Sequence, residues 1–321
     1  MPRPDISIVI PTFNRLDRLK RVLGAVSRQD FAARSYEVIV VSDGSSDGTN
    51  EYLASQSDLA QLKPMYQPNR GPAAARNSGI TAAQGALIVF IDDDVIPIPT
   101  LLTEHVQSHR NSPRDIAVIG PLLTPAEFKL SPWVNWEQEM LVKQYSAMQR
   151  GDWNATPRQF YTGNASIRRD VLLAAGGFDE TFRRAEDVEL AYRLAERGVE
   201  FVFNASAIGW HYAERSFRSW SDAAYAYGRN DAVFARDRNQ AWLLSVIRQE
   251  FSARRLPLRQ LIKSCLNRPF VSAGAQAGMR GLAGIAGLLG LSPIEVAAYS
   301  GIFGIRYYQG FVDEIGEVDF L

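Results

Sequence analysis

The sequence predicts an α/β fold in which a mostly parallel, Rossmann-like sheet carries helices on both faces, followed by a helical C-terminal region. Short β-branched runs alternate with amphipathic helical patterns through the first ~120 residues, as in a parallel sheet covered by helices. The apolar run 86–91 reads as a central strand and leads directly into three aspartates. Beyond Phe217 the pattern is helical to the end of the chain.

Each element follows from the spacing of apolar residues and from turn residues between them. In the first part of the chain we expect strands at 6–10, 38–41, near 65–66 and at 86–91, and helices at 16–26, around 52–53, at 73–83 and at 101–108. Residues 121–157 are rich in tryptophan and predict a helix plus loops. After them we expect a strand at 160–167, helices at 169–175 and 186–197, and short strands at 201–203 and 208–210. The predicted domains are 1–214 and 215–321.

Composition excludes several classes of protein. Lys+Arg and Asp+Glu are both 35, so the formal net charge is zero, which argues against a nucleic-acid partner. Cys265 is the single cysteine and therefore forms no intramolecular disulfide and no thiolate metal cluster, which fits a cytoplasmic location. The N-terminal segment does not read as a signal peptide, and no uncharged apolar run reaches the roughly 20 residues that span a bilayer.

The aspartates Asp92, Asp93 and Asp94 follow a buried strand, where carboxylates are costly unless they are neutralised. At the carboxyl end of a central parallel strand they face the crevice where α/β sheets bind ligands. Oxygen ligands suit Mg²⁺ or Mn²⁺, so the sequence predicts a divalent metal held with the help of this cluster. The alternative is a solvated acidic loop that caps the next helix.

Two further loops extend this prediction. Asp43 ends the second strand and is expected to accept hydrogen bonds from a ligand, whereas Asp47 is expected to close an Asx turn. Arg76 either contacts a ligand directly or forms an ion pair with Asp92 or Asp93. The turn after the first strand carries neither a Gly-x-Gly-x-x-Gly fingerprint nor a Walker loop, which argues against a dinucleotide enzyme and an NTPase.

Five segments in this order resemble the family 2 glycosyltransferases of the GT-A fold. These segments are Pro11–Arg15, Val41–Thr49, Arg70–Asn77, Ile91–Asp94, and Gly176–Glu180 followed by Ala185–Leu190. The resemblance covers roughly residues 5–212 and implies an inverting transferase that uses a nucleoside-diphosphate sugar, with a UDP-sugar favoured, and a divalent metal such as Mn²⁺ or Mg²⁺.

The resemblance also implies roles for individual residues. Thr12 and Asp43 contact the nucleotide base, Asp92 contacts the ribose, and Asp94 binds the metal that bridges the diphosphate. Asp187 is the general base, with Glu186 as its neighbour and fallback; without the resemblance both acids would be read as residues that favour a helix N-terminus. The full set of donor-binding positions is Pro11, Thr12, Asn14, Arg15, Asp43, Arg70, Arg76, Asp92 and Asp93.

Three histidines and the acceptor side complete the predicted site. His211 is expected to be a further metal ligand, with a buried structural histidine as the alternative. His105 and His109 share a helix face but lack a third ligand nearby, so we expect them to be exposed. Gly163 and Asn164 resemble the acceptor-side strand of the family, where Gly163 permits close approach and Asn164 binds a sugar hydroxyl.

The C-terminal part, 215–321, lies outside the resemblance. Basic residues interleave with apolar ones across 243–268, a pattern typical of a basic amphipathic helix on an anionic membrane surface. A glycine-rich hairpin is expected across 269–305, with Gly274, Gly278, Gly281, Gly284 and Gly287 at close helix contacts. The alternative is a helical appendage packed on the catalytic domain or on a second subunit, as in a homo-oligomer.

Together these observations predict a metal-dependent inverting glycosyltransferase. It would act on a saccharide or lipid-linked acceptor, in cell-surface polysaccharide or glycan synthesis at the cytoplasmic face of the membrane. A nucleotidyltransferase and a catalytically inactive nucleotide-sugar-binding subunit are the alternatives. The first would carry a Gly-rich, Lys- or Arg-bearing loop after the first strand, which Thr12-Phe13-Asn14 is not.

Overall fold

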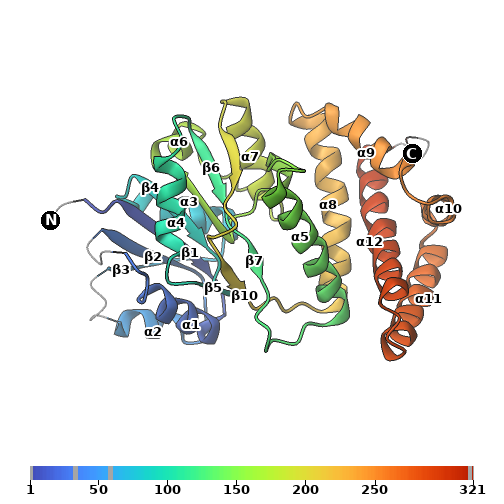
Figure 1. Ribbon diagram of the computed structural model, residues 1–321, viewed down its shortest axis with the longest axis horizontal. Helices are drawn as coiled ribbons and strands as arrows, with labels where there is room; N and C mark the ends of the chain where they lie inside the picture. The colour runs from blue at the N-terminus through green and yellow to red at the C-terminus, as the bar shows by residue number, and fades with distance from the viewer. Residues whose placement is uncertain (1–2, 32–34, 57–60, 317–319, 321) are drawn as a thin grey trace. The chain divides into compact units, whose positions relative to one another are not determined.

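The computed structural model describes residues 3–31, 35–56, 61–316 and 320, and the chain forms two compact units (Figure 1). The first unit comprises the residues up to Lys129 together with Met140–Ala213. The second comprises Leu130–Glu139 and the residues from Glu214 onward. Helix α5 (Pro132–Arg150) contributes residues to both units, which the sequence did not indicate.

The first unit is built on a seven-stranded sheet with the strand order β3-β2-β1-β4-β8-β6-β9. All neighbouring strands pair in parallel except β8, which is antiparallel to β4 and to β6. The predicted α/β class with a mostly parallel sheet is therefore confirmed. The strands are β1 (Ile6–Thr12), β2 (Tyr36–Asp43), β3 (Leu62–Gln67), β4 (Leu87–Ile91), β6 (Ile116–Ile119), β8 (Asn164–Arg168) and β9 (Glu200–Phe203).

Helices cover both faces of this sheet and enclose two hydrophobic cores. Successive side chains of a strand point to opposite faces, so Val9 enters one core while Ile8 and Ile10 enter the other. Because both faces are covered, the strands are nearly continuous apolar runs. The first core packs on α3 (Pro72–Ala82), α6 (Arg169–Ala174) and α7 (Glu186–Glu196), and the second on α1 (Leu16–Val26), α2 (Thr49–Ser55) and α4 (Leu101–Arg110).

A second, three-stranded sheet contains two short strands that the sequence did not predict. It consists of β5 (Val95–Pro97), β10 (Gly209–His211) and β7 (Leu122–Leu123), in that order. Strand β10 is antiparallel to β5 and places His211 opposite Val95, the residue after Asp94. This pairing joins segments that are distant in the sequence. The predicted strand at 160–167 also begins later than expected, at Asn164, after the short 3-10 helix η1 (Pro157–Gln159).

His105 is buried and His109 is half-buried, so the expectation that they are exposed is wrong. His105 is fully buried on α4, with Nδ1 2.8 Å from Ser166 Oγ and Nε2 3.0 Å from Asn164 Oδ1. His109 lies one turn later, and its Nε2 is 2.9 Å from Ser166 Oγ. Burial lowers the pKa of each imidazole to about 4, so both are neutral and fasten α4 to β8.

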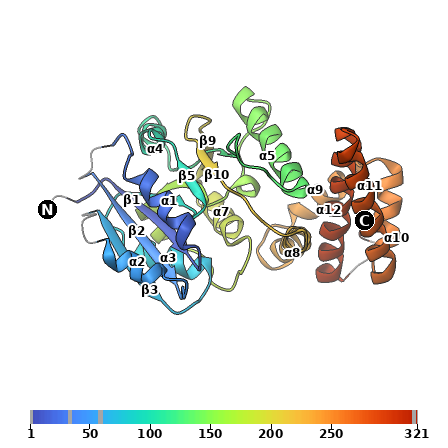
Figure 2. The same ribbon diagram turned by 90° about the horizontal axis from the view of Figure 1, so that it is seen from below.

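The second unit is helical, as predicted for the C-terminal region. It contains α8 (Phe217–Asp237), α9 (Trp242–Ser252), α10 (Leu256–Cys265), α11 (Pro269–Leu288) and α12 (Ser292–Ile315). Helices α8 and α12 lie side by side (Figures 1 and 2). Gly228 of α8 faces the carbonyl of Tyr307, and Gly310 of α12 faces the carbonyl of Tyr225. No side chain fits at either glycine, because a Cβ there would collide with the opposite backbone.

Two expectations for this region need correction. The basic amphipathic stretch forms two helices, because α9 ends at Ser252 and α10 starts at Leu256. Helix α11 does form a hairpin with α12, but open space surrounds four of its glycines: a Cβ added there would have no described atom within 4 Å. These glycines, which therefore make no close helix contact, are Gly274, Gly278, Gly281 and Gly284. Among the described residues, no helix is long and apolar enough to cross a bilayer.

Candidate active site

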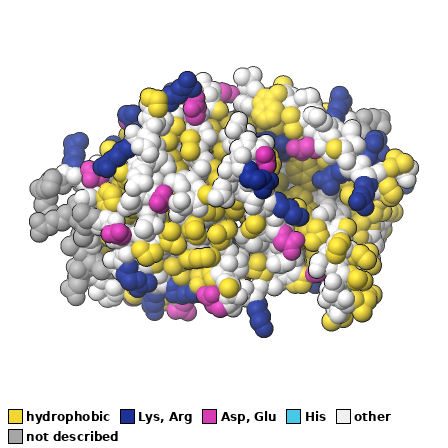
Figure 3. Space-filling model, viewed as in Figure 1, with side chains coloured by type: hydrophobic (Ala, Val, Ile, Leu, Met, Phe, Trp, Pro, Cys, Tyr) yellow, Lys and Arg dark blue, Asp and Glu magenta, His cyan; other side chains and the backbone are white. Residues whose placement is uncertain are grey.

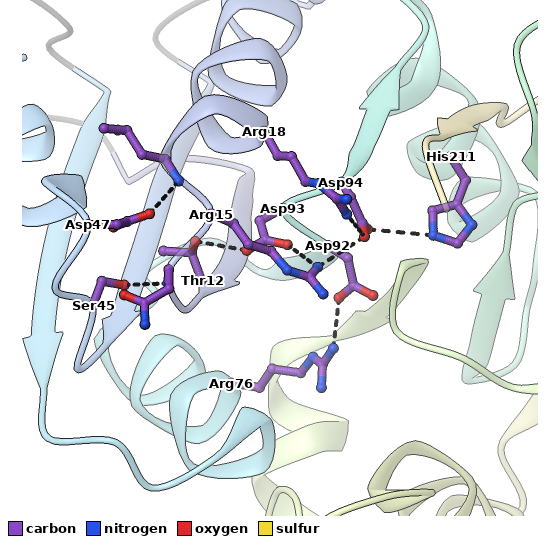
Figure 4. Close-up of polar contacts among 12 residues, drawn as sticks. Thr12, Arg15, Arg18, Ser45, Asp47, Arg76, Asp92, Asp93, Asp94 and His211 are labelled. Carbon is purple, nitrogen blue, oxygen red and sulfur yellow. Dashed lines mark hydrogen bonds and ion pairs between the residues drawn. The ribbon is translucent and has the colours of Figure 1, made fainter. Parts of the chain in front are cut away.

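Loops from three strands meet at one edge of the seven-stranded sheet (Figure 4). Parallel strands β1, β2 and β4 end at the same edge, so the loops that follow them lie together. Asn14 joins two of these loops: its backbone N–H donates to Ser45 Oγ at 3.0 Å, and its Oδ1 accepts from Ser46 N at 2.7 Å. Asn14 has a φ of 53°, a left-handed conformation that asparagine tolerates better than most residues.

Asp47 also links the loop that follows β1 to the loop that follows β2. Its Oδ2 accepts from the backbone N–H of Leu16 at 2.9 Å, at the start of α1. Its Oδ1 accepts from the N–H of Thr49 at 3.2 Å, two residues on, and from the Thr49 hydroxyl at 2.6 Å. The predicted Asx turn is therefore confirmed. Asp47 therefore supports the loops that follow β1 and β2.

Asp93 points into the protein between β1 and β4. Thr12 Oγ1 donates to its Oδ2 at 2.8 Å, and Arg15 Nη1 donates to its Oδ1 at 2.8 Å. Burial raises the pKa of Asp93 to about 6; Arg15 opposes this shift, and Asp94 adds to it. With both oxygens engaged by the protein, Asp93 holds Thr12 and Arg15 in place. A direct donor contact by Asp93 stays a prediction.

Asp94 is surrounded by cationic and imidazole groups. Its Oδ2 lies 3.0 Å from Arg15 Nη1 and 3.1 Å from Arg18 Nη1, while its Oδ1 lies 3.6 Å from His211 Nε2 (Figure 4). The three-stranded sheet brings His211 to Asp94, because β10 pairs with β5 and the backbone N–H of Tyr212 donates to the Asp94 carbonyl at 3.1 Å. The two predicted metal ligands, Asp94 and His211, are thus brought together.

Arg18 is a site residue that sequence reasoning missed. It lies in the first turn of α1, three residues after Arg15, and residues at this spacing share a helix face. Two arginines on one face at the start of the helix that follows the first strand are the signal that could have identified it. Arg15 and Arg18 bring two positive charges to the loop that carries Asp94.

The set of potential metal ligands is small. The described part of the chain contains no group of three or more His, Cys, Asp or Glu side chains that could hold a metal ion. Asp94 and His211 supply one carboxylate and one imidazole, a pair that Mn²⁺ accepts. Ions of this kind complete their shell with phosphate or water oxygens. The ligands therefore fit a metal that is shared with a bound diphosphate rather than an ion held by protein alone.

Asp92 differs from its two neighbours because its side chain is partly open, at 37% exposure. Its Oδ1 accepts from Arg76 Nη2 at 2.8 Å, and its backbone N–H donates to the Gly163 carbonyl at 3.3 Å. A Cβ at Gly163 would lie 3.1 Å from Asp92 Oδ2, so glycine leaves room for this carboxylate. Gly163 thus adjoins the side of the site where donor binding is predicted.

Arg76 is buried and joins two acids. Its Nη2 bonds Asp92, and its Nη1 lies 2.8 Å from Glu186 Oε1 on α7. Asp92 and Glu186 raise the pKa of Arg76 against the effect of burial, so the guanidinium remains charged. The Nε of Arg76 has no hydrogen-bond partner among the described residues. The ion-pair alternative for Arg76 is the arrangement observed.

Asp187 lies in the first turn of α7, directly after Glu186. Ala185 precedes the helix with a φ of 58°, a strained conformation for alanine that turns the chain sharply into α7. Burial raises the pKa of Asp187 to about 7; Glu186 adds to the shift and Arg76 opposes it. A carboxylate with a pKa near neutrality can both accept and release a proton.

Asp43 organises the loop before α3. Its Oδ1 accepts from Arg70 N at 2.9 Å and from Gln67 Nε2 at 2.7 Å, and its Oδ2 accepts from Gly71 N at 2.8 Å. Arg70 in turn forms an ion pair with Glu180 at 2.5 Å. Asp43, the last residue of β2, therefore holds the loop between β3 and α3 that carries Arg70. Their contacts to a nucleotide stay predictions.

Asn164 is a structural residue in this fold. It is fully buried, and its Nδ2 donates to the carbonyls of Ala207 at 2.7 Å and Pro121 at 3.2 Å. Its Oδ1 faces His105 Nε2, so every polar group of the side chain has a partner inside the protein. This position argues against the predicted contact with an acceptor hydroxyl. The sequence could not show which face of β8 the residue occupies.

Comparison with known proteins identifies the family. Residues 7–174, more than half of the chain, match the family model for glycosyl transferase family 2. The chain is 30% identical over 234 residues to validoxylamine A glucosyltransferase from Streptomyces hygroscopicus subsp. jinggangensis, and the match covers 64% of this chain and 55% of that protein. The chain spans about half the length of the first curated relatives that it matches.

Solved structures share the fold. The mannosyltransferase PcManGT from Pyrobaculum calidifontis, in complex with GDP-Man and Mn²⁺, aligns with a TM-score of 0.64 at 20% identity, over 96% of this chain and 88% of that one. S. aureus TarS 1–349 in complex with UDP aligns with a TM-score of 0.53 at 15% identity, over 98% and 92%. The matched family model, the curated relative and the GT-A-like architecture agree. The chain belongs to glycosyl transferase family 2.

Proposed function

We propose that this enzyme is a metal-dependent inverting glycosyltransferase that moves a sugar from a nucleoside-diphosphate donor to a hydroxyl of a saccharide or lipid-linked acceptor. The observation that carries the proposal is the placement of Asp187. It stands beside Glu186, which Arg76 joins to Asp92. One chain of ionic contacts therefore runs from the aspartates of β4 to the helix that carries the proposed base.

Inversion by single displacement needs a group that removes the proton of the acceptor hydroxyl as that oxygen attacks the sugar. Asp187 suits this task because its pKa is raised to about 7, by burial and by Glu186. At neutral pH a large share of the molecules carries the carboxylate, and that carboxylate is more basic than an ordinary aspartate. Glu186 is bonded to Arg76, so we assign it the role of positioning α7.

On the donor side, Thr12 and Asp43 are proposed to contact the base, Asp92 the ribose, and Asp94 with His211 a divalent metal. The metal, when bound, stabilises the negative charge of the leaving diphosphate. Arg15 and Arg18 form ion pairs with Asp94, and their positive charges can also stabilise the same diphosphate. The complexes of PcManGT with GDP-Man and Mn²⁺ and of TarS with UDP support a donor and a metal of this kind.

The acceptor and the cellular setting are proposals at a coarser level. The curated relatives include chondroitin synthase from Escherichia coli, which is 27% identical over 237 residues. This likeness supports a role in cell-surface polysaccharide or glycan synthesis. We place the enzyme in the cytoplasm, with peripheral contact to the inner face of the cell membrane.

A donor screen tests the proposed function. Thermal unfolding would be followed with UDP-, GDP- and dTDP-sugars, each with and without Mn²⁺. A ligand that binds only the native state at a hundred times its Kd adds about 2.7 kcal/mol to the free energy of unfolding. We expect one donor class to raise Tm, more strongly with Mn²⁺, and to be turned over slowly to free sugar and nucleoside diphosphate.

The two alternatives give different results in this screen. Stabilisation by a nucleotide sugar without any turnover would indicate a binding subunit. Release of pyrophosphate from a nucleoside triphosphate and a sugar phosphate would indicate a nucleotidyltransferase. Failure of every donor to shift Tm would remove the proposed function.

A further inference from the structure

Helix α11 in the second unit exposes a long apolar surface. Phe270 at its start is 92% exposed, and Leu288 at its end is 90% exposed. Ile285 is 60% exposed and Leu289 66%. Figure 3 shows hydrophobic side chains along the edge of the molecule where α10 and α11 lie. Large apolar side chains exposed in a contiguous set mark an interaction surface, whereas single ones are ordinary.

The rest of the exposed face of α11 consists mainly of glycine and alanine. Open space lies beyond the Cα atoms of Gly274, Gly278, Gly281 and Gly284, and the neighbouring alanines Ala273 and Ala277 are exposed. Arg280 is the single charged residue of the helix. A helix face in water normally carries many charged and polar side chains. The exposed face of α11 has few of them, so its contact with water is energetically unfavourable.

Positive charge is concentrated in the segment of the chain that contains α10 and α11. Between Phe251 and Ile294 the chain contains six basic residues and no acidic one, although the whole chain has a formal net charge of zero. Arg255, Lys263 and Arg268 are exposed, and Leu256 beside them is 60% exposed. The six basic residues are Arg254, Arg255, Arg259, Lys263, Arg268 and Arg280.

We propose that α10 and α11 form a membrane-binding surface that rests on an anionic lipid bilayer without crossing it. The exposed apolar side chains of α11, together with Leu256, would enter the boundary between headgroups and acyl chains. The exposed basic residues Arg255, Lys263 and Arg268 would bind lipid phosphates. The small residues between Phe270 and Ile285 let the helix backbone lie close to the bilayer.

The charge pattern selects a membrane over a second copy of the chain. A symmetric dimer would place the same basic residues of two copies near each other, and like charges across an interface repel. Anionic lipid headgroups neutralise them instead. This proposal rests on the second unit alone, so it can fail while the proposed transferase activity stands.

Cosedimentation of the full-length protein with vesicles tests the proposal. The vesicles would be phosphatidylcholine alone, or a mixture of about two parts phosphatidylcholine and one part anionic phosphatidylglycerol. We expect binding to the anionic vesicles at about 0.1 M salt that is largely lost at about 1 M salt, because salt screens exposed charges. Each basic residue near an anionic surface contributes about 1 kcal/mol, or roughly fivefold in affinity. Lys263→Glu should therefore weaken binding at least about fivefold.

Matched variants separate this surface from general effects. Leu288→Asp should weaken vesicle binding at least about tenfold, since it puts a charge where an apolar side chain enters the bilayer. Leu173→Asp, on α6 in the first unit, and Arg28→Glu, shortly after α1, should leave binding unchanged; both positions are exposed and lie outside the surface. Circular dichroism would show that each variant is folded.

Two results would overturn the proposal. One is equal binding of wild type and both surface variants to anionic vesicles. The other is a concentration-dependent dimer, seen by light scattering without lipid, that Leu288→Asp dissociates; that result would assign the surface to a second copy. Donor turnover on a soluble acceptor should be the same in Leu288→Asp and wild type in either case.

Discussion

Nη1 of Arg76 lies 2.8 Å from Oε1 of Glu186, the residue that precedes the proposed base on α7. The other terminal nitrogen of Arg76 lies 2.8 Å from Oδ1 of Asp92. A guanidinium is a rigid planar fork, so one side chain sets the positions of both carboxylates at once. In the proposed reaction, Arg76 therefore couples the donor side to the base, although it bonds the neighbour of Asp187 rather than Asp187 itself.

Replacement of Arg76 tests this coupling. Arg76→Lys keeps the positive charge but cannot make both bonds in the same geometry. We expect a loss of about 30-fold in kcat/KM, equivalent to about 2 kcal/mol of transition-state stabilisation, carried mainly by kcat. Steady-state kinetics with a saturating donor would measure the change.

A second arginine provides the control for Arg76. Arg193 on α7 bonds Glu189 of the same helix and the carbonyl of Gly177, so it holds α7 from a different side. Arg193→Lys should lower Tm to a similar degree as Arg76→Lys while kcat stays within about threefold of wild type, which is less than about 1 kcal/mol. Equal losses of kcat in both variants would mean that Arg76 acts only through stability.

The raised pKa of Asp187 predicts how stability changes with pH. A carboxyl group whose pKa is raised in the folded state favours folding while protonated, and stability falls as pH rises from about 4 to about 7. Asp187→Asn removes this loss. We expect the variant to exceed wild type in Tm at pH 8 by at least roughly 2–4 °C, equivalent to about 1 kcal/mol, and to match it at about pH 4.

Asp170 serves as the control, because its pKa is shifted in the opposite direction to that of Asp187. It lies in the first turn of α6, and its hydrogen bond with Arg168 lowers its pKa. Asp170→Asn should therefore reduce stability at about pH 8 and lose this effect at low pH, as the wild-type carboxylate becomes protonated. A gain in stability at high pH for both variants would show that the Asp187 effect does not come from its environment.

Substitutions of Asp93 and Asp94, in the loop after β4, should have different effects on metal binding. Asp94→Asn should abolish the additional rise in Tm that Mn²⁺ gives in the presence of donor, since it removes the proposed carboxylate ligand. Asp93→Asn should retain most of that rise, because Asp93 bonds Thr12 and Arg15 inside the protein. A metal effect that survives Asp94→Asn but not Asp93→Asn would reverse these assignments.

Glycines in the second unit should respond to substitution according to their surroundings. Gly228→Ala would push a methyl group into the carbonyl of Tyr307, and we expect a loss of about 1–3 kcal/mol from overpacking. Gly278→Ala enters open space in the middle of α11 and should stabilise the protein by about 0.5–1 kcal/mol. Urea unfolding monitored by circular dichroism would compare the two. Destabilisation by Gly278→Ala would contradict the open face of α11.

Long periodic elements could be predicted from the sequence because their signals are local. The strand that begins at Ile6 and the helix that begins at Leu16 show their apolar spacing directly. The same holds for the run that leads into Asp92. The aspartates could therefore be assigned to one edge of the sheet from the sequence, since parallel strands share that edge.

The small sheet and the buried histidines depend on contacts between distant segments. Strand β5 contains Pro97 and has three residues, and β7 has two, so neither carries a recognisable period. His211 reaches Asp94 only through this sheet. Likewise, nothing local distinguishes an exposed His105 from one buried against β8, or shows which way Asn164 points. The contact of Arg18 with Asp94 could be predicted only by assuming that one face of α1 lies against the loop after β4.

In the proposed reaction, Asp187 removes the proton of the acceptor hydroxyl. The most direct measurement compares kcat for wild type and Asp187→Asn from about pH 5 to 9, with donor affinity measured in parallel by calorimetry. We predict a wild-type kcat that falls below a pH of about 7 as Asp187 becomes protonated, and a loss of about 10²–10⁴-fold in the variant. Donor affinity should remain within a few-fold of wild type. An Asp187→Asn enzyme that keeps wild-type kcat and the same pH profile would contradict this account.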